Sequence, residues 1–271
     1  MIAAGELLIC ANCRQGQVDI RVRLERPDIA RFFVGMSGEQ VVAAAPLIYT
    51  LCGRAQQAAA AAALAVAAGR PPPPIDDDAL WREHLHACLW RLCLDWPMAL
   101  ARPLAEQEAA RSAFAHWHRQ TRTSPAVFAR ATKNILYALA ANLPVEPSPI
   151  HALCNAQWEK AQKAWRALQK NAPYPLVARG KNGVGAGRTQ TARGTLTHVL
   201  RLHAGRIGAY RVHTPTDRHF ANAAPLTAQF NALCAIRREN ADNASLRQIL
   251  ECATLALDPC VPHRLEWRES A

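Results

Sequence analysis

Alternating hydrophobic and polar positions near the N-terminus predict two β-strands. Residues Gln17–Leu24 read QVDIRVRL, with an apolar side chain at every second position, and Leu7–Cys10 form a short apolar run before them. Successive side chains of a strand point to opposite faces, so this alternation is typical of a half-buried strand. With Gly16 in the turn, the two runs are expected to pair as an N-terminal hairpin.

Apolar positions then recur every three or four residues, which predicts helices through the first half of the chain. Residues 38–69 are rich in alanine and are expected to form one helix, irregular before Pro46, that neighbouring helices can approach closely. Asp76–Asp78 are expected to cap a further helix that ends before Pro97.

Two Ser-Pro pairs predict two more helix starts, because serine is a favoured N-cap and proline a favoured first helical residue. These pairs are Ser124-Pro125 and Ser148-Pro149.

The last third of the chain contains a second hairpin pattern and two helical patterns. Residues 192–216 predict two alternating strands. Helices are expected near 225–236 and 245–257, the second capped by Ser245 and ended at Asp258.

A glycine-rich segment precedes the second hairpin and is tested as a phosphate-binding loop. Residues 180–188 read GKNGVGAGR, which matches neither the P-loop spacing nor the dinucleotide-binding spacing. Residues 178–190 are therefore expected to be a flexible loop. The elements together predict an α+β fold, mainly α, in a single domain over residues 1–271: a helical bundle core with N-terminal and C-terminal β-hairpins.

Composition and charge limit the classes of partner. The chain has 271 residues, 50% of them hydrophobic, and a net charge of +11, so a globular protein is expected. The basic residues are scattered and no nucleic-acid-binding motif accompanies them, so nucleic acid is not an expected partner. The alanine-rich run at 55–68 is too short and too weakly apolar to cross a membrane. The sequence MIAAGELLIC lacks the basic and apolar regions of a secretory signal, which predicts a cytoplasmic protein.

Nine cysteines, in a chain with no predicted export, favour free thiols and metal chemistry over disulfides. Cys10 and Cys13 form a C-x-x-C pair without a second pair nearby, so a structural role is favoured over metal binding. His84 and Cys88 lie one helical turn apart, with Cys93 beyond them, in apolar surroundings that favour core packing.

Several stretches resemble the large subunit of nickel–iron hydrogenases. That family has a Cys-Gly-x-Cys-x-x-x-His motif near its N-terminus and an Asp-Pro-Cys-x-x-Cys-x-x-His motif at its C-terminus. This chain has LCGRAQQAA at 51–59 and DPCVPHRLE at 258–266. ARGTLTH and VHTPT resemble another family stretch, in which Arg193 falls on the arginine beside the diatomic ligands of the iron. The opening strands resemble the first two strands of the family, with Ala4 where a proton-gating glutamate is expected.

The departures from these motifs fall on metal ligands. Cys52 and Cys260 match the two ligands that bind nickel alone, whereas Ala55 and His263 replace the two bridging cysteines. Nickel and iron need the bridging thiolates to occupy one site, so neither hydrogen turnover nor nickel is expected. Ala59 and Glu266 stand where the family has histidines.

A short large-subunit-like chain with one cysteine left from each pair resembles the hydrogenase maturation proteins of the HupK/HoxV type. The resemblance implies a non-catalytic scaffold that assists assembly or transfer of the iron carrying cyanide and carbon monoxide. Cys52 and Cys260 would bind this iron transiently, Arg193 would donate to cyanide, and His263 would be an extra ligand or donor. The implied partners are the hydrogenase large subunit precursor and maturation proteins of the HypC and HypD types.

Two other hypotheses remain open at this point. One is a degraded metal-dependent oxidoreductase that retains a site at Cys52, Cys260 and His263. The other is a basic adaptor that binds nucleic acid, for which steep salt dependence of binding is the expected sign.

Overall fold

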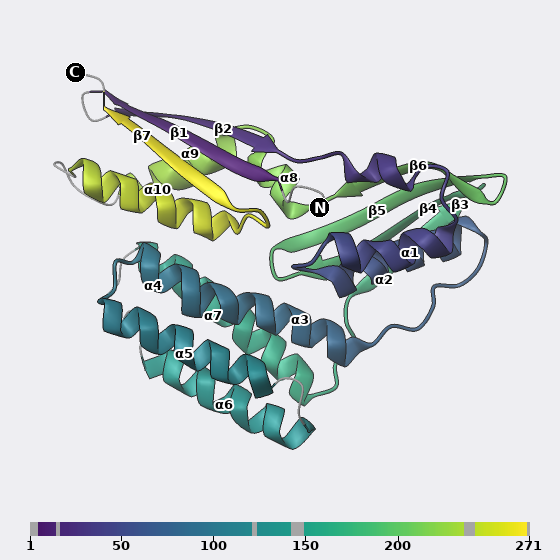
Figure 1. The fold of residues 1–271 in the computed structure, drawn as a ribbon, viewed down its shortest axis with the longest axis horizontal. Coiled ribbons are helices and arrows are strands. Elements are labelled where there is room, and N and C mark those ends of the chain that lie inside the picture. Colours follow the sequence, from purple (N-terminus) through teal and green to yellow (C-terminus); the bar gives the residue numbers. More distant parts are fainter. Residues whose placement is uncertain (1–4, 15–16, 121–123, 142–148, 236–241, 270–271) are drawn as a thin grey trace.

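The computed structural model describes residues 5–14, 17–120, 124–141, 149–235 and 242–269. Figure 1 shows two β-sheets side by side along one edge of the molecule and a group of helices, α3 to α7, below them. This is an α+β, mainly helical fold, as the hydrophobic pattern predicts. Three residues named in the sequence analysis lie outside the described residues: Ala4 at the proton-gating position, Gly16 in the predicted turn and Ser148 as a predicted N-cap.

The first sheet joins the two ends of the chain. The predicted hairpin is present as β1 (Glu6–Arg14) and β2 (Gln17–Glu25), which pair antiparallel. A third strand, β7 (His263–Glu269), pairs parallel with β1, so the strand order is β2-β1-β7. This strand was not predicted from the sequence, yet it brings the chain after Cys260 beside the N-terminal strand.

The second sheet corrects the flexible loop expected at 178–190. Most of that segment forms β3 (Leu176–Lys181) and β4 (Val184–Thr191), joined at Asn182 and Gly183, which both have positive φ. The predicted hairpin follows as β5 (Gly194–His203) and β6 (Arg206–His213), and the four strands pair antiparallel in chain order. Asn-Gly favours the tight turn that joins two strands, a hairpin signal that the phosphate-loop test overlooked.

The glycines of β3 and β4 allow the sheet to lie directly on α2 (Gly53–Ala67). A Cβ placed on Gly185 would be 2.0 Å from the Ala63 oxygen, and one on Gly187 would be 2.0 Å from the Ala59 oxygen. The alanine-rich helix thus permits close approach, but by a strand rather than by the helices that the sequence predicted. The glycines serve close packing, not flexibility.

We expect Gly187→Ala to destabilise the protein by at least about 2 kcal/mol, since strand or helix must move to admit the methyl group. Chemical denaturation measures this loss. The matched control is Ala186→Ser, on the opposite face of the same strand, where the change in unfolding free energy should stay within about 0.5 kcal/mol. Equal small effects of both substitutions would contradict the close approach.

The helix expected over residues 38–69 is two helices. α1 (Gly38–Ile48) ends just after Pro46, and α2 starts at Gly53 with Cys52 as its N-cap residue. A Cβ on Gly53 would be 3.1 Å from the Pro46 oxygen, so the two helices meet closely at this break. The connection of residues 49–52 therefore places Cys52 at the start of a helix rather than inside one.

The helical bundle follows the predicted starts. Asp76 caps α3 (Asp77–Trp90) by accepting a hydrogen bond of 2.9 Å from the Ala79 amide. Pro125 and Pro149 are the first residues of α6 and α7, as the Ser-Pro pairs predicted. The bundle comprises α3, the π-helical turn η2 (Arg91–Asp95), α4 (Trp96–Ala99), α5 (Leu104–Gln120), α6 (Pro125–Ala141) and α7 (Pro149–Gln169).

Between the second sheet and β7 the structure describes three helices. They are α8 (Pro215–Phe220), α9 (Ala224–Cys234) and α10 (Asn243–Leu257), and a short 3₁₀ turn, η1 (Ile29–Phe33), follows β2. The predicted cap at Ser245 is wrong: Asp242 is the N-cap of α10 and accepts a hydrogen bond from the Ser245 amide. The predicted end at Asp258 is confirmed by its left-handed φ of 51°.

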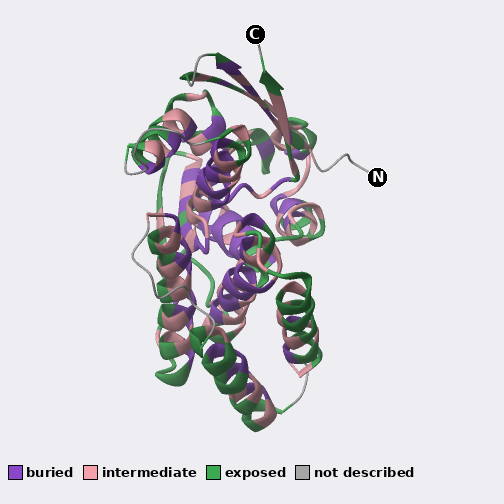
Figure 2. Ribbon diagram, turned by 90° about the vertical axis from the view of Figure 1, so that its left-hand side faces the viewer, coloured by how far each residue is buried: buried purple, intermediate pink, exposed green. Residues whose placement is uncertain are grey.

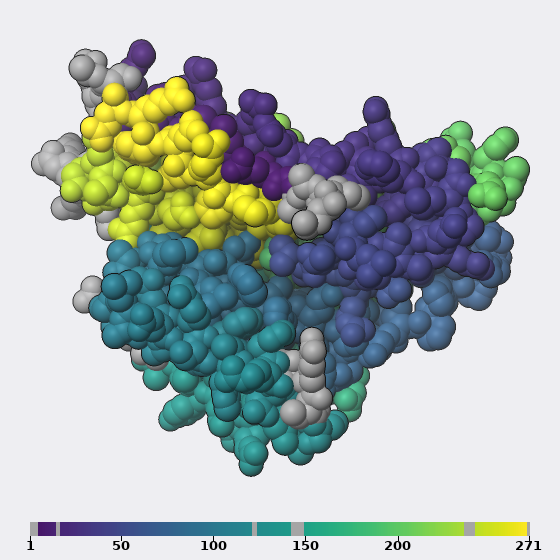
Figure 3. Space-filling model, in the orientation of Figure 1, coloured from purple at the N-terminus to yellow at the C-terminus, as the bar shows by residue number. Residues whose placement is uncertain are grey.

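Buried residues line the inner faces of the helices and the regions where the sheets meet them (Figure 2). In the space-filling view the N-terminal and C-terminal segments lie together above the helical bundle (Figure 3). None of the described helices has both the length and the apolar character that a bilayer crossing requires.

Candidate functional site

Cys52 lies at the junction of α1 and α2, where the helix break positions its thiol. Its amide donates to the Tyr49 oxygen at 3.3 Å, and Gln56 Nε2, one turn into α2, donates to its Sγ at 3.5 Å. Burial raises the pKa of the Cys52 thiol to about 11, while the Gln56 hydrogen bond and the positive charge of Arg193 act in the opposite direction. The thiol is therefore protonated near neutral pH, and binding of a soft cation there must release a proton.

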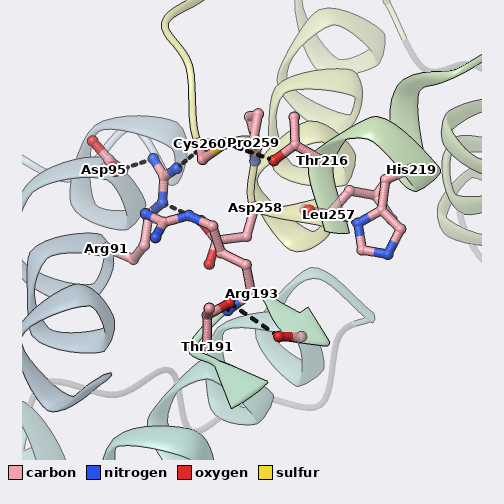
Figure 4. Close-up of polar contacts among 11 residues, drawn as sticks. Arg91, Asp95, Thr191, Arg193, Thr216, His219, Leu257, Asp258, Pro259 and Cys260 are labelled. Carbon is pink, nitrogen blue, oxygen red and sulfur yellow. Dashed lines mark hydrogen bonds and ion pairs between the residues drawn. The ribbon is translucent and has the colours of Figure 1, made fainter. Parts of the chain in front are cut away.

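Cys260 lies just after α10 and is held by Thr216 of α8. The Thr216 hydroxyl accepts from the Cys260 amide at 3.0 Å and donates to its Sγ at 3.1 Å (Figure 4). Thr216 is fully buried, so no water competes for this pair of hydrogen bonds. These two hydrogen bonds fix the position of the Cys260 thiol.

Cys52 and Cys260 line one cavity although 208 positions separate them in the sequence (260 − 52). The cavity has a volume of about 560 Å³. It lies where the α1–α2 junction, β5 and the segment after α10 meet. Three further polar side chains of this lining are Arg26, Tyr49 and Arg193.

Arg193 lines the same cavity as both cysteines and is almost completely buried. Its side chain is 6% exposed, and its Nε is 3.3 Å from Asp258 Oδ1. Its Nη1 is buried and has no hydrogen-bond partner among the described residues. A buried guanidinium nitrogen without an acceptor costs free energy, so a ligand that supplied an acceptor to this nitrogen would relieve that cost.

Asp258 is the counter-ion of two arginines. Arg91 of η2 donates from its Nε to Asp258 Oδ1 at 2.6 Å, from Nη1 to Asp95 at 2.5 Å and from Nη2 to the Pro259 oxygen at 2.5 Å. Figure 4 shows Arg91 and Arg193 on the same side of Asp258. The aspartate of the DPC motif therefore ties the Cys260 segment to the helical bundle and to β5.

His263 does not join the two cysteines. Its Nε2 is bonded to Glu251 Oε1 of α10 at 2.6 Å, and it lines a neighbouring cavity that contains Cys260 and Arg193 but not Cys52. In the described ranges no group of three or more His, Cys, Asp or Glu side chains is placed to hold a metal ion. The structure thus gathers Cys52, Cys260 and Arg193 around one cavity and places His263 in a neighbouring cavity with Cys260 and Arg193.

A buried polar chain behind Cys52 escaped the sequence analysis. Gln56 Oε1 is 2.6 Å from His198 Nε2, and His198 Nδ1 is 2.7 Å from the Tyr210 hydroxyl. Since Gln56 Nε2 faces Cys52, its oxygen must accept from His198 Nε2, and Nδ1 then accepts from Tyr210. Burial lowers the pKa of His198 to about 3, which agrees with a neutral ring. His198 is the last residue of the ARGTLTH stretch, whereas nothing in the sequence singled out Gln56.

The surroundings of the other cysteine and histidine candidates favour structural roles over metal binding. Cys10 and Cys13 are three residues apart on β1, so their side chains point to opposite faces and cannot bind one metal ion. Cys88 is fully buried, and His84 Nδ1 is 3.1 Å from the Tyr174 hydroxyl. Burial raises the pKa of both Cys88 and Cys93 to about 12, as expected for inert core thiols.

Comparison with known proteins finds similarity to hydrogenase-related chains. A hydrogenase expression/formation protein HupK from Azotobacter vinelandii is 27% identical over an alignment of 339 positions, covering 95% of this chain and 97% of the relative. The alignment is longer than this chain, so the relative contains additional segments. A hydrogenase expression/formation protein HupV from Azotobacter chroococcum mcd 1 is 41% identical over 96 residues, but the match spans only 35% of this chain and 26% of that relative.

A solved structure extends the similarity to the fold. A chain of an NAD⁺-reducing [NiFe]-hydrogenase in the H₂-reduced state superposes with a TM-score of 0.57 and 14% identity, covering 90% of this chain and 93% of that one. No family model matches the sequence. The fold is therefore similar to that of a [NiFe]-hydrogenase chain, as the motifs led us to expect.

Proposed function

We propose that this chain, a HupK-type relative of the nickel–iron hydrogenase large subunit, is an accessory protein that assists assembly or transfer of the iron carrying cyanide and carbon monoxide. The coarse part of this proposal, a role in hydrogenase maturation, is supported by what the relatives are named for. The finer part, the iron group as cargo, is supported by the chemistry of the site.

One observation carries the finer part: a buried guanidinium with an unpartnered nitrogen lies beside two cysteines in one cavity. Thiolates are soft ligands suited to low-spin iron. Cyanide on that iron offers a nitrogen acceptor, and Arg193 Nη1 is a charged donor without an acceptor. The residues present therefore fit this cargo.

The same residues support transient binding of the iron group. Only two cysteines line the cavity, and Ala55 and His263 supply neither of the bridging thiolates. Release of the iron group is assisted by the high pKa of Cys52, because a buried thiol regains its proton readily. A site that binds cargo and lets it go suits a donor rather than an enzyme.

The oxidoreductase hypothesis requires a different arrangement. It needs Cys52, Cys260 and His263 around one metal ion, but in the described structure His263 is engaged with Glu251 and lines a cavity without Cys52. No observation favours this alternative over a transfer site.

Restoring the two missing cysteines by Ala55→Cys and His263→Cys is expected to leave the protein without hydrogenase activity. The histidines that the family has at the positions of Ala59 and Glu266 would still be absent. Ala55 is also 1% exposed, so a larger side chain there disturbs the start of α2. Hydrogen uptake is measured in cells with an intact maturation system, beside the wild-type chain. Uptake by the double variant would contradict this reading of the departures.

The maturation role is tested by deleting the gene in its own host and measuring hydrogen uptake. We expect uptake to fall and to return with the wild-type gene but not with Cys52→Ala or Cys260→Ala. Anaerobic purification of tagged protein should also recover the hydrogenase large subunit precursor or the HypC-type and HypD-type proteins. Normal uptake in the deletion strain, together with recovery of none of these partners, would contradict the proposal.

A further inference from the structure

The four-stranded sheet packs one face on α2, and among the described helices we find none packed on its opposite face. A Cβ built on Gly180, Gly185 or Gly187 would meet the backbone of α2, so these positions lie on the covered face of the sheet. The residues next to them along β3 and β4 point to the opposite face, and the antiparallel register extends this assignment to β5 and β6. We call this opposite side the outer face.

The ionisable side chains of the outer face are all basic. They come from all four strands and all are exposed: Arg179, Lys181, Arg188, Arg201, Arg211 and His213. The sequence contains no aspartate or glutamate between Glu159 and Asp217, so the whole sheet lacks acidic side chains. The scattered basic residues of the sequence are thus gathered here by the register of the strands.

None of the four arginines or Lys181 forms an ion pair with any residue that the structure describes. By contrast, several arginines of the first sheet are paired: Arg21 with Asp19, Arg264 with Glu6, and Arg268 with Glu266. A solvated sheet face ordinarily mixes both signs of charge, because like charges repel. One sign alone indicates that the opposite charges come from another molecule.

The strand register places small uncharged side chains directly opposite the basic ones. Arg179 pairs with Ala186, and Arg211 pairs with Val199. Arg201 lies between Val184 and Ala209. Every cation therefore has an uncharged neighbour directly across the sheet, which lowers repulsion and leaves each guanidinium able to take a carboxylate in bidentate geometry.

We infer that the outer face is a docking surface for a protein that presents a cluster of aspartate and glutamate side chains. Arginine outnumbers lysine on it, as is typical of protein interfaces. It carries no Phe, Tyr or Trp on which nucleic-acid bases could stack. A second copy of this chain, with a net charge of +11, is a poor match for the same surface. This inference does not depend on the iron site.

The test places a photo-crosslinking amino acid at Thr197, in the centre of the outer face, in anaerobically grown host cells. The adduct is identified by mass spectrometry, and the captured protein is purified and titrated against the wild-type chain. We expect it to carry an acidic patch and to bind more weakly as salt rises. The triple variant Arg179→Gln, Arg188→Gln, Arg211→Gln should weaken binding by about tenfold or more.

The matched control removes the same charge from the other sheet by Arg21→Gln, Arg264→Gln and Arg268→Gln, and should bind as the wild type does. The iron content of the outer-face variant should also be unchanged, which separates this inference from the proposed transfer role. A short DNA duplex, single-stranded RNA and phosphatidylglycerol vesicles are titrated in parallel. No adduct, an adduct protein without an acidic patch, equal weakening by the control, or loss confined to nucleic acid or vesicles would overturn the inference.

Discussion

Cys52→Ala and Cys260→Ala are each expected to abolish loading with iron, cyanide and carbon monoxide while the fold stays intact. Each substitution removes one of the two cysteines that line the cavity beside Arg193. A single thiolate provides neither the affinity nor the orientation that a two-thiolate site gives. Iron content and infrared spectra of anaerobically purified protein report loading, and circular dichroism reports the fold.

Cys10→Ala is the matched control for these variants. Cys10 is also partly buried and free, but it lies on β1, away from the cavity. Its replacement should change neither iron content nor spectra. Wild-type iron content and infrared bands in both Cys52→Ala and Cys260→Ala would overturn the site assignment.

Asp258→Asn is expected to lower the free energy of unfolding by about 3 kcal/mol, because it leaves Arg91 and Arg193 buried without their shared counter-ion. Asparagine tolerates the left-handed backbone at this position, so the loss reports charge rather than strain. Urea denaturation measures the change.

Asp95→Asn separates the role of Asp258 from that of any Arg91 contact. Arg91 would keep Asp258 and the Pro259 oxygen, and the Asp95 side chain is 20% exposed, so a loss of about 1 kcal/mol is expected. Equal effects of the two substitutions would show that Asp258 does not hold the two arginines together.

Local signals in the sequence predicted local structure well. Alternation identified β2, β5 and β6, and the Ser-Pro pairs identified the starts of α6 and α7. These features depend on neighbouring residues, whose spacing the sequence displays directly.

Features that depend on contacts between distant segments were harder to predict. The segment expected to be a flexible loop is a strand, in which Gly187 packs closely on Ala59. The parallel pairing of β7 with β1 joins residues more than 250 positions apart, for example Leu7 with His263. The hydrophobic pattern of either segment alone does not indicate which distant strand it pairs with.

The candidate site shows the same division. Motif resemblance singled out Cys52, Cys260 and Arg193, which the fold brings to one cavity. It also singled out His263, whose Nε2 is bonded to Glu251 and which lines the neighbouring cavity with Cys260 and Arg193. Gln56 and Thr216, which hydrogen-bond to the two sulfurs, act through geometry that only the folded chain reveals.

The most direct test is an infrared spectrum of the wild-type protein, purified anaerobically from a host that makes the iron group and from the same host without its maturation genes. The proposed function predicts bands of metal-bound cyanide and carbon monoxide in the first preparation, with iron present, and none in the second. Protein that is folded and still binds its maturation partners, yet shows no such bands in the first preparation, would contradict it.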